Sequence, residues 1–380
     1  MSYPLWRAFR CPRKPHYSAQ RPLPMYFQFH PLSLTRAARG LALTLLLATG
    51  AATAGPISVP DILAELSLSD YQGYVEDLVA FDTRWYATEG NTQATDYVRD
   101  TLSGFGLDTR EHLFDYNGFR LANVEATLPG LVRPDDIFIL GAHFDSIASR
   151  SPGNPSATDA PGADDNASGT AGMLEIASVL SRYRFEATIR FVGFNAEEQG
   201  MLGSAAYAAD AQAAGERILG MVNLDMIART DGTVGEDIEV IGNAGLVDLL
   251  LANIDAFTTL PVSGHVEKPM WSDHQWFAAD EYPGSESVML IEDEDWEVWS
   301  TNPDYHKVTD TADKLDYAFA LAVSRGATAA MIDLAGLTAV PALVPTPTTW
   351  MLLLPGVLML WLCSWRADAL RLSAYKIAPR

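Results

Sequence analysis

The sequence predicts an α/β fold with three layers, α/β/α, in which a mainly parallel central sheet is covered by helices on both faces. Three observations support this prediction. Short apolar runs recur along residues 121–291, as in strands that are buried on both faces. Segments with helical periodicity separate several of these runs, as the crossovers between parallel strands require. Polar residues follow the ends of the runs, where ligands gather in such sheets.

The elements are expected in the following order along the chain. Residues 59–106 are mostly helical, and the helical periodicity is clearest in residues 74–81 and 95–105. Strands are expected at residues 121–128, 137–140, 188–194, 218–224, 238–241 and 288–291. Further helices are expected at residues 170–183, 201–212 and 317–337. Because helices alternate with strands here, most neighbouring strands should be parallel.

Composition divides the 380 residues into three zones. Residues 1–54 contain seven basic and no acidic residues, and an apolar run precedes small residues that end at Ala54. This pattern predicts an N-terminal extension and a signal peptide, with Met25 as a second possible start. A mitochondrial presequence is the alternative. Residues 55–343 are expected to form the functional domain.

Residues 344–380 are expected to be a C-terminal sorting signal or transmembrane anchor. A Pro-Thr-Pro motif precedes an apolar run, and the basic residues after it favour a cytoplasmic tail. The pattern resembles a bacterial PEP-CTERM signal, although Thr346 stands where that family usually has Glu. The segment would then be inserted in the membrane or processed by an exosortase-like enzyme. Both ends of the chain predict an exported protein, in the periplasm, at the cell surface or outside the cell.

Residues 55–343 contain 15 basic and 47 acidic residues, which gives this domain a formal net charge of −32. Such a charge argues against nucleic acid and anionic lipid as its partners. Both cysteines, Cys11 and Cys363, lie outside the domain. The domain is therefore expected to be stabilised by its apolar core, with or without metal, and not by disulfides.

The first two candidate motifs place a histidine and carboxylates after an apolar strand. His143 and Asp145 follow the strand expected at residues 137–140. Residues two apart in an extended segment point to the same side, so His143 could bind a metal while Asp145 orients its ring. Asp165 lies among small residues in 162–169, which suits a tight loop that directs a carboxylate at a cation. For each motif alone there is an alternative, which is a surface histidine for His143 and an acidic surface turn for residues 162–169.

Two further motifs follow the next buried strands. Glu197 and Glu198 come after residues 188–194, and two adjacent carboxylates at a buried strand end repel each other unless a cation or proton compensates them. One of the two can bind a metal while the other acts as a general base. The alternative is a solvated helix start. Asp225 follows residues 218–224, with a helix N-cap as its alternative.

The last motif is a polar loop with Tyr305 and His306 before the final helix, and an ordinary solvated loop is its alternative. Together the five motifs supply imidazole and carboxylate groups, which are ligands that zinc binds in proteins. Five such ligands with one shared carboxylate would serve two zinc ions about 3.5–4 Å apart. The motifs are therefore more specific in combination than any one of them is alone.

The ordered motifs GAHFDS, GADDNASG, NAEEQG, NLDM and YHKVTDT resemble those of the secreted two-zinc leucyl aminopeptidases of bacteria, in peptidase clan MH. The resemblance covers roughly residues 75–337. It implies a zinc-exopeptidase fold, which is phosphorylase/hydrolase-like, with two Zn²⁺ ions per chain. It further implies that Asp165 bridges the two ions, that His143 and Asp225 complete one site, and that Glu198 and His306 complete the other.

The same resemblance implies roles for the other candidates. Glu197 would be the general base, and Tyr305 would hydrogen-bond the developing oxyanion. The motif Ser272-Asp273-His274 also recurs in relatives, and Asp273 would line the substrate pocket or be structural. Met226 could shape an apolar pocket for the first side chain, with ordinary core as the alternative. The implied reaction is hydrolysis of the first residue of a peptide with a free N-terminus, by a water that both zinc ions activate.

Two other readings stay open. A carboxypeptidase, or a glutaminyl cyclase that uses one zinc, would keep the fold and change the reaction. A surface binding domain without catalysis would lack some of the ligands, whereas this chain retains all five. His112 and His265 belong to no motif and are expected at the surface.

Overall fold

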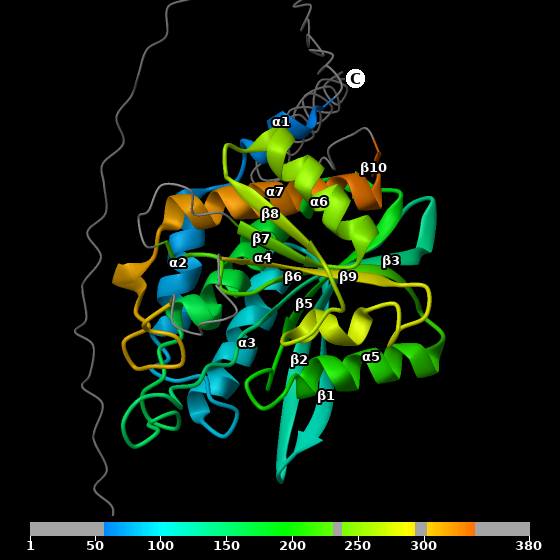
Figure 1. Cartoon of the computed structure of the whole chain (residues 1–380). Coiled ribbons are helices and arrows are strands. Elements are labelled where there is room, and N and C mark those ends of the chain that lie inside the picture. Colours follow the sequence, from blue (N-terminus) through cyan, green and yellow to red (C-terminus); the bar gives the residue numbers. More distant parts are fainter. Residues whose placement is uncertain (1–56, 231–237, 293–301, 339–380) are drawn as a thin grey trace, which may run out of the picture. The chain divides into compact units, whose positions relative to one another are not determined.

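The computed structural model describes residues 57–230, 238–292 and 302–338 (Figure 1). The predicted signal peptide in residues 1–54 and the predicted sorting signal in residues 344–380 lie outside these ranges. Within the described ranges the predicted fold class is confirmed. A mixed, mostly parallel sheet of eight strands has helices on both faces.

The strands of this sheet are β1 (Asp108–Tyr116), β2 (Phe119–Leu128), β3 (Arg133–His143), β5 (Ala187–Phe194), β6 (Arg217–Leu224), β7 (Ile238–Gly242), β8 (Val262–Val266) and β9 (Glu286–Glu292). The helices are α1 (Val59–Leu63), α2 (Leu68–Val79), α3 (Glu89–Gly104), α4 (Gly169–Leu180), α5 (Leu202–Ala214), α6 (Ala244–Phe257) and α7 (Tyr317–Ala335). Short helical turns are η1 (Ala163–Ser168), η2 (Asp273–Phe277) and η3 (Ala312–Lys314). A separate small ladder pairs β4 (Arg184–Phe185) with β10 (Leu337–Thr338).

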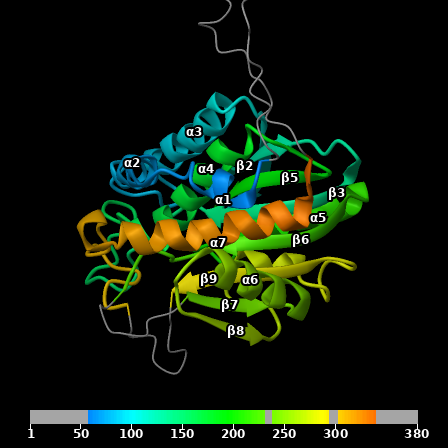
Figure 2. The same cartoon turned by 90° about the horizontal axis from the view of Figure 1, so that it is seen from above.

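Four parallel strands lie at the centre of the sheet. The strand order is β1-β2-β5-β3-β6-β9-β7-β8, and Figure 2 shows it from β2 to β8. β5, β3, β6 and β9 are parallel neighbours, as are β7 and β8 at one edge. β1 with β2, β2 with β5, and β7 with β9 pair antiparallel. The carboxyl ends of the four central strands therefore lie at one edge of the sheet, where ligands bind in such folds.

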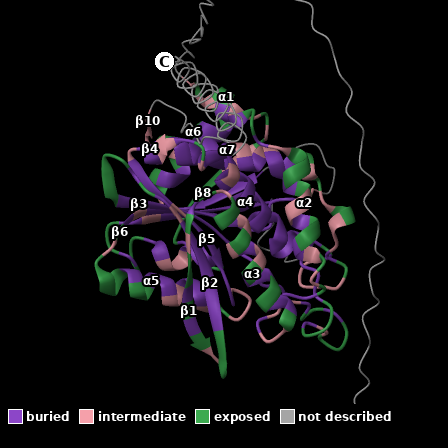
Figure 3. Cartoon of the chain, turned by 180° about the vertical axis from the view of Figure 1, so that it is seen from behind, coloured by how far each residue is buried: buried purple, intermediate pink, exposed green. Residues whose placement is uncertain are grey.

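The two faces of the sheet pack against different helices. Phe138 and Leu140 of β3 belong to the larger core, whose helices include α2, α4, α6 and α7. Ile137 and Ile139 point to the opposite face and pack with Tyr207 of α5. Figure 1 shows α5 on the side of the sheet opposite to α7, and Figure 3 shows that the central strands are buried. The apolar runs of the sequence are thus strands covered on both sides.

Helix α7 is the one helix in the described ranges that is long and apolar enough to cross a membrane by length and composition. Its apolar window is 67% buried inside the protein. Gly326 packs against Ile254 of α6, and a Cβ at this glycine would lie 2.5 Å from an Ile254 side-chain carbon. The burial and this close packing are those of a core helix.

The structure differs from the sequence prediction at several places. Residues 59–106 are mostly helical as predicted, but a break separates α2 from α3, and Asp82 has φ 61° in it. β1 and β8 were not predicted, because both are edge strands whose many exposed residues weaken the apolar pattern. α6 was also missed, although its buried Leu246, Leu250 and Ile254 have helical spacing.

Candidate metal centre and active site

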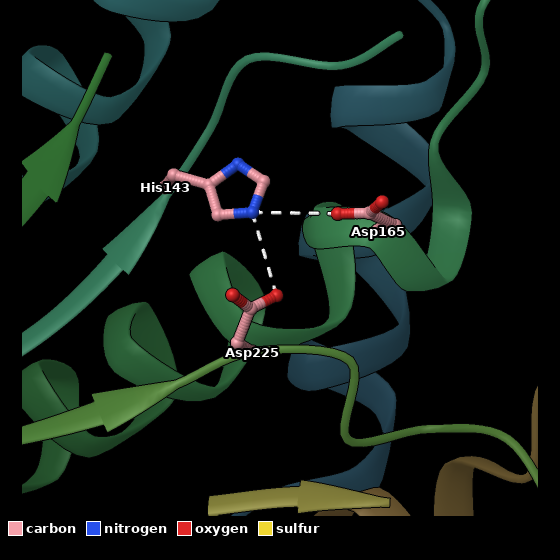
Figure 4. Close-up of side chains that lie close together, drawn as sticks. All are labelled: His143, Asp165 and Asp225. Carbon is pink, nitrogen blue, oxygen red and sulfur yellow. Dashed lines mark ion pairs between the residues drawn. The ribbon is translucent and has the colours of Figure 1, made fainter. Parts of the chain in front are cut away.

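The first group of candidate ligands comes from three separate segments. His143 is the last residue of β3, Asp165 lies in η1, and Asp225 follows the end of β6. The Nε2 atom of His143 is 3.3 Å from Oδ1 of Asp165 and 3.4 Å from Oδ1 of Asp225 (Figure 4). All three residues are buried. The parallel strands bring these side chains to the same sheet edge, as the strand-end argument predicts.

The second group shares Asp165 with the first. Nε2 of His306 is 3.1 Å from Oδ2 of Asp165 and 3.0 Å from Oε2 of Glu198. Glu198 follows β5, and His306 lies in the loop before α7. Asp165 therefore directs one carboxylate oxygen at each group, which is the arrangement of a bridging ligand.

The residues of both groups fit divalent cations. Within each group the candidate ligand atoms all lie within 4.8 Å of one another. Zinc bonds of about 2.0–2.2 Å at tetrahedral angles separate two ligand atoms by about 3.3–3.5 Å, which is near the observed spacings. Oε1 of Glu198 is buried and makes no hydrogen bond, and the nearest group to Oδ2 of Asp165 is the ring of His306. Buried carboxylate oxygens without donors are costly unless a cation compensates them.

The electrostatics of the two histidines reflect the same excess of carboxylates. Burial lowers the pKa of His143, but the carboxylates of Asp225, Asp145 and Asp165 outweigh it and raise the pKa well above its ordinary value. Burial also lowers the pKa of His306, but the carboxylates of Glu198 and Asp165 outweigh this effect and raise the pKa to about 11. A site that attracts protons this strongly also favours a metal cation in their place.

Glu197 lies beside the two groups without belonging to either. It lines the same cavity as His143, Asp165 and Asp225, but it is in neither cluster of possible ligands. Burial, followed by the nearby carboxylates of other residues, raises the pKa of Glu197 well above its ordinary value. Its carboxylate thus belongs to neither ligand group, and it is close enough to act on a molecule bound in the cavity.

Asp145 contacts both the first ligand and the Glu197 turn. Its Oδ1 and Oδ2 accept hydrogen bonds from the backbone N–H groups of Glu197 and Glu198, at 3.1 and 3.3 Å. Nδ1 of His143 lies 3.5 Å from Oδ1 of Asp145, and 3.3 Å from the backbone oxygen of the same residue. Asp145 is therefore in contact with His143, as predicted, and it also holds the next ligand-bearing turn.

The cavity over these residues has a polar and an apolar side. The apolar side consists of Met226, Trp271, Met289, Ile291 and the ring of Tyr305. Met226 packs in one cluster with Met289 and Ile291. An apolar wall in the same cavity as a group of carboxylates suits a ligand with an apolar side chain next to a cationic group.

The comparison of sequences decides the family. The model of peptidase family M28 matches residues 123–331, which is more than half of the chain. The chain belongs to peptidase family M28. Among curated relatives, the probable leucine aminopeptidase 1 of Trichophyton verrucosum is 29% identical over 282 residues, which cover 68% of this chain and 72% of that protein.

Solved structures share the fold of this M28 chain. A zinc aminopeptidase from Bacillus subtilis superposes with a TM-score of 0.59 at 15% identity, covering 70% of this chain and 95% of that one. The glutaminyl cyclase of Porphyromonas gingivalis also has a TM-score of 0.59, at 20% identity, covering 71% of this chain and 99% of that one. At these identities the likeness shows the three-layer fold.

In the M28 domain, Asp273 does not line the cavity, so of its two predicted roles the pocket-lining one is wrong. It is fully buried and is not among the residues that line the cavity, whereas Met226 is. Its neighbour Ser272 instead donates a hydrogen bond of 2.5 Å to Oδ2 of Asp225 and accepts one of 2.8 Å from Asn223. The Ser272-Asp273-His274 motif therefore supports a candidate metal ligand through its serine.

Arg84 is a residue of the M28 site that sequence reasoning missed. It is 0% exposed, and no other arginine or lysine in the described ranges is buried. Its guanidinium donates to the backbone oxygen atoms of Phe144 at 2.6 Å, Pro161 at 2.6 Å and Gly162 at 2.8 Å. These atoms belong to the segments of His143 and Asp165. An arginine in a break between helices gives no sequence signal specific enough to predict this.

The prediction that His112 lies at the surface was wrong. His112 is 9% exposed, Asn123 lies 3.1 Å from its Nδ1, and Asp210 lies 3.0 Å from its Nε2. It lies on β1, which the sequence analysis did not recognise as a strand. His265 is half exposed, as expected.

Proposed function

We propose that this chain is a zinc-dependent aminopeptidase that hydrolyses the first peptide bond of a substrate with a free N-terminus. The observation that supports this most directly is the pair of ligand groups that share Asp165, with Glu197 beside them in one cavity. Membership of family M28 and the leucine aminopeptidases among its relatives agree with this proposal.

We assign the residues of the two groups as metal ligands. His143, Asp165 and Asp225 would hold one zinc, and Asp165, Glu198 and His306 would hold the other. Zinc ions in these positions would act as Lewis acids on the scissile carbonyl and on the attacking water.

Glu197 and Tyr305 would perform the proton transfer and the charge stabilisation. Glu197 takes a proton from the water as its oxygen bonds to the carbonyl carbon, and it returns the proton to the amine when the C–N bond breaks. Burial and the nearby carboxylates raise the pKa of Tyr305 well above its ordinary value, so its hydroxyl stays protonated. It can then donate a hydrogen bond to the oxygen on which negative charge develops.

The carboxylates explain why a free amino end would be selected. Asp165, Glu197 and Asp225 line the cavity and together attract the ammonium group of an N-terminal residue. An acylated amine has no charge, and in the same place it would leave these carboxylates without that partner. The apolar wall would meanwhile receive the first side chain.

Metal analysis and substrate choice test the proposal together. The purified protein is expected to contain two zinc ions per chain and to release a chromogenic amine from a leucine amide. Chelation should abolish the activity and added zinc should restore it. Hydrolysis only of acetyl-leucine amide, or full activity after zinc has been removed, would contradict the proposal.

The glutaminyl cyclase among the structural neighbours makes cyclisation the second function to test. A cyclase releases ammonia from a peptide with N-terminal glutamine and leaves its length unchanged. The two ligand groups favour the aminopeptidase, because the one-zinc alternative would not need both. Mass spectrometry of a Gln-Leu-Phe peptide distinguishes a loss of 17 mass units by cyclisation, about one ammonia, from loss of the whole first residue.

Met289 offers a test of the apolar wall. It is 2% exposed and lines the cavity, so Met289→Ala would enlarge the space for the first side chain. We expect kcat/KM for a phenylalanine amide to rise about tenfold relative to a leucine amide, since a few methylene groups are worth this much. Met221 is also buried, but it packs in a different cluster, with Ile139 and Tyr207, and does not line the cavity. Met221→Ala should lower stability and leave the substrate ratio unchanged.

We also propose that the domain works outside the cytoplasm. The basic and apolar end zones and the absence of cysteine from residues 55–343 support this. Cell fractionation with an antibody against the domain would test it, and detection of the full-length chain in the cytosolic fraction alone would contradict it.

A further inference from the structure

Three asparagines form a buried hydrogen-bond network at the loop that bears Glu197 and Glu198. Asn91 and Asn195 exchange two side-chain hydrogen bonds, of 2.9 Å from Asn91 to Asn195 and 3.0 Å in return. Asn123 accepts a hydrogen bond of 3.0 Å from the backbone N–H of Asn195. The three residues are 3%, 0% and 0% exposed. Buried amides that are fully paired in this way specify one arrangement of the segments they join.

The network holds both ends of the loop that bears Glu197 and Glu198. At the first end, the side chain of Asn195 also accepts a hydrogen bond of 2.8 Å from the backbone N–H of Ala196. At the second end, Asn123 donates a 2.8 Å hydrogen bond to the backbone oxygen of Gly203. The N–H of Gly203 donates in turn to the backbone oxygen of Asn195, at 3.1 Å.

The fit around Gly203 allows little movement. A Cβ at this position would lie 2.2 Å from Oδ1 of Asn123 and 2.2 Å from the backbone oxygen of Asn195. No side chain larger than hydrogen fits there, so the two ends of the loop approach each other as closely as their backbones permit. The loop between β5 and α5 is therefore closed at its base by the asparagines.

The loop itself needs such support. Ala196 and Met201 both have φ 58°, in the left-handed region that residues with a side chain rarely adopt. Such conformations cost free energy and persist where the surrounding structure imposes them. Asn91 reaches the loop from α3, and its amide also donates a hydrogen bond of 2.8 Å to the backbone oxygen of Arg84. It thus joins the segment of Arg84 to the Glu197 loop.

We propose that Asn91 is a positioning residue for Glu197 and Glu198, acting through Asn195 and the backbone of the loop. Asn91 is not among the residues that line the cavity, so it contacts neither substrate nor the candidate ligands there. Its effect on the reaction rests on the proposed function, because that function makes Glu197 the base. Its effect on the loop does not depend on any activity.

The experiment compares Asn91→Ala with Asn253→Ala in the full chain. Asn253 is a matched control: it is 8% exposed, lies on α6 and donates to the backbone oxygen of Leu249. Both variants are expected to unfold at lower temperature. For Asn91→Ala we expect kcat on a leucine amide to fall about tenfold or more, since small misplacements of a catalytic group have such effects. KM should change less than about threefold, and Asn253→Ala should retain the wild-type kcat.

Hydrogen exchange gives a readout that needs no activity. Amides of residues 195–203 should exchange about tenfold faster in Asn91→Ala than in the wild type or in Asn253→Ala, because the loop opens more often. If Asn91→Ala does not accumulate as folded protein, Asn195→Ala tests the same pair from its other side. Unchanged kcat and unchanged exchange in residues 195–203 would overturn the proposal. If the wild-type chain has no aminopeptidase activity but residues 195–203 still exchange faster in Asn91→Ala, the proposed function is overturned and the positioning role remains.

Discussion

Replacing Glu197 with glutamine is expected to lower kcat about 10²–10⁴-fold, which is the usual contribution of a general base. The amide keeps the size of the side chain but cannot take a proton from the attacking water. Because Glu197 belongs to neither ligand group, the variant should still contain two zinc ions per chain. Steady-state kinetics on a leucine amide and metal analysis of the same sample would measure both effects.

Glu175 provides the matched control for this variant. It is a buried glutamate on α4 whose Oε1 accepts a hydrogen bond from the backbone of Ser67, away from the cavity. Glu175→Gln should retain the wild-type kcat. A Glu197→Gln enzyme that binds zinc and cleaves as fast as the wild type would remove Glu197 from the mechanism.

Replacing Arg84 with methionine is expected to lower the free energy of unfolding by about 3–5 kcal/mol. The change leaves the buried backbone oxygens of Phe144 and Pro161 without their arginine donor, at about 1–3 kcal/mol each. The backbone oxygen of Gly162 also loses this donor but keeps the N–H of Ala167. It also removes a buried cation that the carboxylates of Asp310, Asp145 and Asp165 stabilise. Denaturant unfolding at saturating zinc would measure the loss.

Two further variants separate the causes of this effect. Arg84→Lys retains the charge but not the planar arrangement of donors, so it should recover only part of the stability. Arg99 is a partly exposed arginine with ion pairs on the outside of α3, and Arg99→Met should change the free energy of unfolding by less than about 1 kcal/mol. A loss of less than about 1 kcal/mol in Arg84→Met would contradict the role of Arg84 as a buried clamp.

Much of the fold could be predicted from short stretches of sequence. The apolar runs that became β3, β5, β6 and β9 need burial on both faces, and the helices between them favour parallel pairing. β1 and β8 lack this signal because an edge strand leaves many of its side chains exposed. Local patterns therefore revealed the centre of the sheet better than its margins.

The candidate ligands were also accessible to sequence reasoning, for a physical reason. His143 is the last residue of a central strand, Glu198 and Asp225 follow the ends of two others, and parallel strands bring such ends to one edge. The motifs and this rule together predict the cluster that the structure contains.

What surrounds the ligands depends on contacts between segments that are far apart in the chain. Arg84 binds Phe144 across 60 residues, and Asn91 binds Asn195 across 104. The residues next to Asp273 in the sequence do not show whether its side chain faces a cavity or the interior. Only the packing of η2 buries it. The sequence by itself determined the sheet centre, the charge zones and the candidate ligands, because periodicity and strand-end position are local properties. The tertiary structure alone decided which polar side chains support them, because burial and hydrogen-bond partners exist only once distant segments have packed.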